Sequence, residues 1–92
     1  MSQPTVGRIV HYTLNEGDVS LINSRTPQSY EGPTVRNHVQ AGDTYPAIVV
    51  RVFDPSTTTA NLQVLLDGNC TYWATSRTEG DGAGHWAWPP RV

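Results

Sequence analysis

The segment YPAIVVRVF at residues 45–53 and the segment ANLQVLLDG at residues 60–68 decide the fold of this chain. Both are rich in the apolar and β-branched residues typical of strands. Side chains alternate between two faces along a strand. In the first segment this alternation predicts that Ile48, Val50 and Val52 face a core while Arg51 faces solvent.

The second segment shows a cleaner alternation. It predicts a buried face made by Leu62, Val64 and Leu66, and a polar face made by Asn61, Gln63 and Asp67. The connector DPSTTT at residues 54–59 is rich in turn-forming residues, and Pro55 suits an early turn position. Two alternating segments joined by a short polar connector predict a β-hairpin.

Three further strands are expected, at residues 6–14, 69–77 and 85–88. Residues 15–44 form a long polar stretch, which predicts a long first loop, with short added strands near residues 19–22 and 34–39 as an alternative. Five strands at this spacing predict an all-β fold, a small five-stranded SH3-like barrel over residues 1–92 as a single domain. An open sheet, or a β-sandwich built by oligomerisation, is the alternative.

Composition limits the possible partners. The 92-residue chain has a net charge of −2 and no lysine, and its six arginines are scattered singly. A duplex nucleic-acid binder needs a basic stripe to neutralise phosphates, and attachment to an anionic membrane needs a basic cluster. The sequence lacks a secretory signal pattern and an apolar run near the roughly 20 residues of a membrane helix. We therefore expect neither a nucleic-acid nor a membrane partner.

Aromatic residues are the strongest candidates for a binding site. Trp, Tyr and Arg dominate the residues that contribute most to protein interfaces. The predicted partner-binding residues are Tyr45, Tyr72, Trp73, Arg77, Trp86 and Trp88. The alternative is that these large aromatics supply core volume in a small domain.

Catalytic and metal sites are not expected. His11, His38, His85 and Cys70 do not stand at metal-ligand spacing, and a single cysteine forms no internal disulfide. No nucleophile motif surrounds Ser76 or Cys70, and the glycine-rich residues 80–84 lack the Lys-Ser/Thr of a phosphate loop. We expect a protein that is not an enzyme and uses no cofactor.

Five short segments resemble a group of small proteins encoded by tailed bacteriophages and prophages. They are GRIVHY at residues 7–12, PAIVVRV at 46–52, NLQV at 61–64, WATS at 73–76 and HWAWP at 85–89. The resemblance skips residues 15–44. It implies a phage context and carries over no binding residues.

Two functions fit that context. The first is a virion accessory protein, a capsid decoration, cement or head–tail component that binds capsid or tail proteins through its aromatics and long loop. The alternative is an inhibitory or sequestering module in the host cytoplasm, which binds a host protein or a small nucleotide signal in an aromatic pocket. A homo-oligomer is compatible with either.

Overall fold

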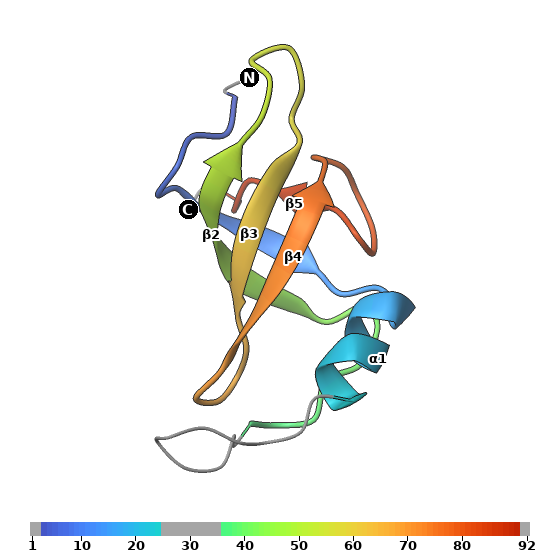
Figure 1. The fold of residues 1–92 in the computed structure, drawn as a ribbon. Helices are drawn as coiled ribbons and strands as arrows, with labels where there is room; N and C mark the ends of the chain where they lie inside the picture. Colours follow the sequence, from blue (N-terminus) through green and yellow to red (C-terminus); the bar gives the residue numbers. More distant parts are fainter. Residues whose placement is uncertain (1–2, 25–35, 91–92) are drawn as a thin grey trace.

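The computed structural model describes residues 3–24 and 36–90 of the chain (Figure 1). They form one antiparallel five-stranded sheet and one short helix. The elements are β1 (Ile9–Thr13), α1 (Glu16–Ser24), β2 (Thr44–Val52), β3 (Ala60–Leu65), β4 (Thr71–Arg77) and β5 (Trp86–Ala87). The five predicted strands are all present, but the helix makes the fold mostly β and not all-β.

The sheet is strongly curled but is not closed into a barrel, so the prediction of an SH3-like barrel is wrong. The strand order is β4-β3-β2-β1-β5, which leaves β4 and β5 as the two edges. In Figure 1, β1 and β5 cross behind β3 and β4. The chain that follows β4 runs beside β5, through a single parallel bridge between Glu79 and Trp86. Along the rest of β4 the two edges form an open seam.

The strand register defines the core face of the sheet. Val10, Ala47, Val64 and Tyr72 are successive Cα partners across β1, β2, β3 and β4. All four are buried. This row is part of a core whose other members include Tyr12, Leu14, Val49, Leu62, Leu66 and Trp86.

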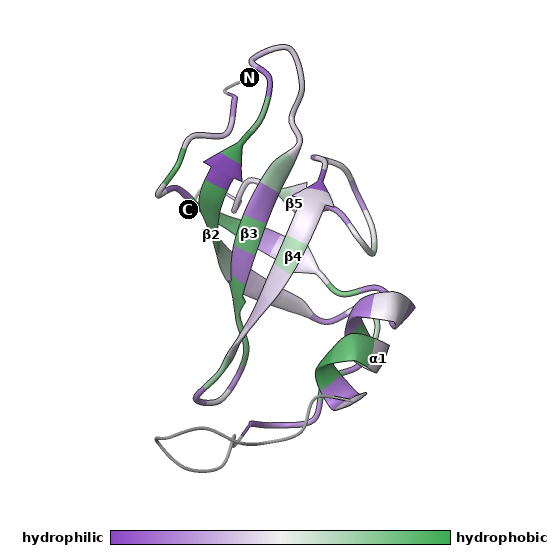
Figure 2. Ribbon diagram, in the orientation of Figure 1, coloured by the Kyte–Doolittle hydropathy of each residue, from purple (hydrophilic) through white to green (hydrophobic). Residues whose placement is uncertain are grey.

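The predicted buried face of the segment at residues 60–68 is confirmed, but Asn61, predicted on its polar face, is buried and accepts the backbone N–H of Ser76. The predicted faces of β2 are wrong. Leu62, Val64 and Leu66 are buried, and the β3 ribbon alternates between hydrophobic and hydrophilic segments in Figure 2. In β2 the buried residues are Ala47 and Val49, whereas Val50 and Val52 are 40% and 38% exposed. The cause is the unbroken apolar run at residues 47–50, which has no polar residue to mark a face, and a bulge between Val49 and Arg51. Arg51 is exposed, as predicted.

Helix α1 includes residues 19–22, so the alternative of an added strand there is wrong. Asn15 precedes the helix, and its Oδ1 accepts the backbone N–H of Asp18 at 2.7 Å. In return, Asp18 Oδ2 accepts the backbone N–H of Asn15 at 2.9 Å. This reciprocal pair is a capping box, which satisfies two backbone donors at the start of the helix. Val19 and Ile22 then pack against the core.

The rest of the predicted long loop is described only in part. Residues 25–35 lie outside the described residues. In the segment considered for a strand at residues 34–39, the described portion has one isolated bridge, between Arg36 and Gly68. Arg36 also donates to Ile22 O at 3.2 Å and to Asn23 Oδ1 at 3.0 Å, which ties this segment to the end of α1.

Candidate interaction surface

The face of the sheet opposite the core presents an uncharged, mostly apolar row of outward-facing residues. Ile9 is the Cα partner of Ile48, Ile48 of Gln63, and Gln63 of Trp73. This row is one residue away from the buried row on every strand, so alternation directs its side chains outward. Ile9 is 54% exposed and Trp73 is 58% exposed. The ladder of four strands therefore holds an isoleucine and a tryptophan at opposite ends of one exposed row.

Two further apolar residues extend this row along the strands. Val50 and Leu65 are 40% and 37% exposed. We call the resulting surface the outer face, made by Ile9, Ile48, Val50, Gln63, Leu65 and Trp73. None of the six is charged. Apolar residues scattered over a surface are ordinary, whereas a contiguous apolar patch on a soluble monomer is often functional.

The structure separates the aromatic residues that the sequence singled out. Trp73 lies on the outer face, whereas Tyr72 and Trp86 are buried in the core. Trp88 is half-buried, with its ring edge-on to Trp86 at a centroid distance of 5.3 Å. Tyr45 is half-buried and donates to Asp43 Oδ2 at 3.2 Å. Core packing thus accounts for Tyr72 and Trp86, and Trp73 is the aromatic most available to a partner.

Arg77, the remaining predicted site residue, is an internal ligand of a buried carboxylate. Its Nη2 donates to Asp18 Oδ1 at 2.7 Å. The same carboxylate accepts the hydroxyl groups of Tyr12 at 2.5 Å and of Tyr72 at 2.7 Å. Asp18 is only 1% exposed. We call these four residues the Asp18 cluster; a buried charge of this kind is tolerated because it is paired and hydrogen-bonded.

The Asp18 cluster changes the titration of its tyrosines. Burial, followed by the hydrogen bond to Asp18 and the negative charge of that carboxylate, raises the pKa of Tyr12. The same three causes, in the same order, raise the pKa of Tyr72. Both hydroxyl groups therefore remain protonated donors well into the alkaline range.

A distortion of β4 brings Arg77 to this cluster. Ser76 has a φ of 56°, in the left-handed region that non-glycine residues rarely adopt. Its backbone N–H donates to Asn61 Oδ1 at 2.8 Å, and the register between β3 and β4 shifts beside Asn61. Simple alternation from the outward Trp73 would direct Arg77 outward as well. The bulge redirects it toward Asp18.

The Asp18 cluster spans the seam between the two halves of the curled sheet. Tyr12 belongs to β1, Tyr72 and Arg77 belong to β4, and Asp18 belongs to α1. Backbone bonds also join the chain after β4 to the other half of the sheet: Trp86 O accepts Gly80 N–H at 3.0 Å and Thr13 O accepts Gly84 N–H at 2.8 Å. The side-chain hydrogen bonds of the cluster therefore link β1 and β4, whereas in a closed barrel the edge strands would be linked by backbone hydrogen bonds.

Comparison of the chain with protein-family models, with curated proteins and with solved structures gave no match. Across residues 3–24 and 36–90, no helix is long and apolar enough to cross a membrane. Within the same ranges, no three side chains of the His, Cys, Asp and Glu types gather closely enough to hold a metal ion.

Proposed function

We propose that this chain is a non-enzymatic interaction protein that binds another protein through its outer face, and that the partner is a capsid or tail protein of a virion. The observation that carries the binding proposal is the uncharged outer face, with Trp73 at 58% exposure. The centres of protein interfaces are depleted in charged residues and enriched in aromatic ones. The outer face has that composition.

The rigidity of the sheet supports this proposal. Ile48 and Gln63 each pair with residues of both neighbouring strands, and Ile9 pairs with a residue of β2. Their backbone therefore needs little ordering when a partner binds, which lowers the entropic cost of association. Trp73, on the edge strand β4, combines a large contact area with few rotatable bonds.

The virion assignment rests on the resemblance of residues 7–12, 46–52, 61–64, 73–76 and 85–89 to small phage and prophage proteins. A decoration or head–tail component needs a stable scaffold and a surface that binds neighbouring proteins. A host-directed inhibitor could use the same face, so the identity of the bound protein separates the two functions.

Site-specific photocrosslinking tests the proposal. The chain is produced with Trp73→p-benzoylphenylalanine during phage growth, and the crosslinked protein is identified by mass spectrometry. A matched control carries the same group at Asp81, an exposed residue of the loop between β4 and β5. We expect a capsid or tail protein to be captured at position 73 and not at position 81.

Three other outcomes would contradict parts of the proposal. Capture of a host protein at position 73 would keep the outer face and reject the virion assignment. Equal capture at both positions, or none at position 73, would reject the outer face as the binding surface.

A further inference from the structure

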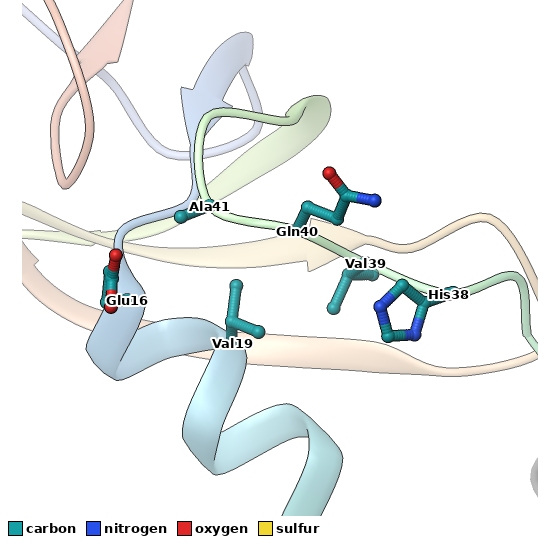
Figure 3. A pocket seen from close by; sticks show the side chains of 6 residues that line it. All are labelled: Glu16, Val19, His38, Val39, Gln40 and Ala41. Carbon is teal, nitrogen blue, oxygen red and sulfur yellow. The ribbon is translucent and has the colours of Figure 1, made fainter.

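A pocket of about 270 Å³ lies between helix α1 and the segment that leads toward β2 (Figure 3). Val19 projects from the helix toward this segment, and Val39 projects from the segment toward the helix. The pocket is lined by Glu16, Val19, His38, Val39, Gln40 and Ala41. It shares no residue with the outer face.

The pocket combines an apolar middle with polar ends. In Figure 3 the side chains of Val19 and Val39 lie between those of Glu16 and His38. Glu16 and His38 are both exposed, and neither side chain has a hydrogen bond or an ion pair with another residue of the described ranges. A ligand could therefore pair with the Glu16 carboxylate without displacing an internal partner.

The charged groups around the pocket leave it negative. Asp43 lies close by, since its Oδ2 accepts the backbone N–H of Gln40 at 2.9 Å. Arg36 is the cation nearest to His38 in the sequence. Its guanidinium donates to Ile22 O and Asn23 Oδ1 at the other end of the helix. Asp18 is neutralised by Arg77. Among residues 3–24 and 36–90, no cationic side chain pairs with the Glu16 carboxylate, which stands at the edge of an apolar hollow.

We propose that this pocket binds an alkylammonium group, the side chain of a lysine or a free aliphatic amine. The methylene stem would lie along Val19 and Ala41, above the buried Val39, and the ammonium group would pair with Glu16. Lysine side chains bury their stems on apolar surface while the charged head stays at the rim. The chain itself contains no lysine, so such a group comes from another molecule.

The binding is weak on physical grounds. Glu16 is exposed, and an exposed ion pair stabilises by about 0–1 kcal/mol, which corresponds to a factor of up to roughly 5 in affinity. We therefore expect a single lysine side chain to bind only weakly. Such a pocket would add specificity to a larger contact and would not supply its main affinity.

The test is a titration of the ¹⁵N-labelled chain followed by NMR. The probes are Nα-acetyl-lysine-N-methylamide, the norleucine analogue that keeps the stem without the charge, and n-pentylamine, a free amine with the same charge as the lysine probe. We expect the lysine probe to shift the amide signals of Val19, Val39 and Ala41 with saturation. The norleucine probe should bind at least threefold more weakly.

Two variants locate the charge that matters. Glu16→Gln should weaken the lysine probe about three- to fivefold, and Asp81→Asn, which removes an exposed charge of the β4–β5 loop, should not. Equal binding of the norleucine probe, no effect of Glu16→Gln, or shifts confined to other residues would each overturn the proposal. Tighter binding of n-pentylamine than of the lysine probe would identify a free amine as the ligand, and weaker binding would identify a protein lysine.

Discussion

Asp18→Asn is the substitution from which we expect the largest effect for the smallest change in shape. Asparagine keeps the size of the side chain and one acceptor oxygen, which can still accept the backbone N–H of Asn15. It removes the negative charge that pairs with Arg77. With that oxygen at the Oδ2 position, the N–H₂ group replaces Oδ1 and faces the Arg77 guanidinium, which can only donate, so two donors face each other.

The size of the effect follows from the burial of the pair. Removing one partner of a buried ion pair costs about 3–5 kcal/mol. The Arg77 side chain keeps 26% of its exposure, so water compensates part of the lost charge. We therefore expect Asp18→Asn to lower the free energy of unfolding by about 2–4 kcal/mol, against a total of roughly 5–14 kcal/mol for a domain of this size.

Urea unfolding followed by tryptophan fluorescence and circular dichroism measures this loss. Asp81→Asn is the matched control, because it removes the same charge from an exposed residue and should change stability by less than about 0.5 kcal/mol. If Asp18→Asn does not fold, Tyr72→Phe, which removes one hydrogen bond, should cost about 1–2 kcal/mol. A loss below about 1 kcal/mol for Asp18→Asn would refute the view that this cluster holds the seam.

Three other predictions follow from the same structure. Trp86→Ala should cost about 3–5 kcal/mol of stability because Trp86 is fully buried, and Trp73→Ala should cost less than half as much; equal losses in urea unfolding would contradict the assignment of Trp73 to an exposed face. Ser76→Gly should stabilise the protein by about 0.5–1 kcal/mol because its left-handed φ strains any residue with a Cβ; a lower urea midpoint would argue against that strain. Stability should fall as the pH rises above about 10, because the tyrosines Tyr12 and Tyr72 ionise near that pH when unfolded and at higher pH when folded, by at most about 1.4 kcal/mol per pH unit for each. Replacing both by phenylalanine should flatten this decline, which pH-dependent unfolding would show.

The sequence predicted the strands well because strand signals are local. Residues 60–68 alternate apolar and polar residues, and their buried face is confirmed. In residues 45–53 the alternation is hidden by an apolar run, so the face of β2 could not be predicted, although the strand itself could. Whether the sheet closes into a barrel depends on pairing between its edge strands β4 and β5, which no local pattern encodes.

The sequence contains a signal for helix α1. Asn15 and Asp18 stand at the spacing of a capping box, and acidic residues occupy the first turn of α1. Gly17 and the turn-forming residues around it favoured a loop instead.

The candidate sites were predictable only in part. Residue type alone identified Trp73 as a candidate. That Trp73 is exposed while Trp86 is buried follows only from the strand register. The partners of Asp18 could not be predicted, because they stand 6, 54 and 59 residues away in the sequence.

Those same separations have a consequence for the order of folding. Asp18 can meet Tyr72 and Arg77 only after β4 has paired, since their bonds close loops of 54 and 59 residues. Long-range contacts of this kind tend to form late, after the rate-limiting step that assembles the hairpins. Loss of the Asp18 cluster should therefore leave the refolding rate nearly unchanged and accelerate unfolding, by about 30-fold for each 2 kcal/mol lost. The residues that hold the seam would then govern how long each folded molecule lasts, and have little influence on how quickly it is made.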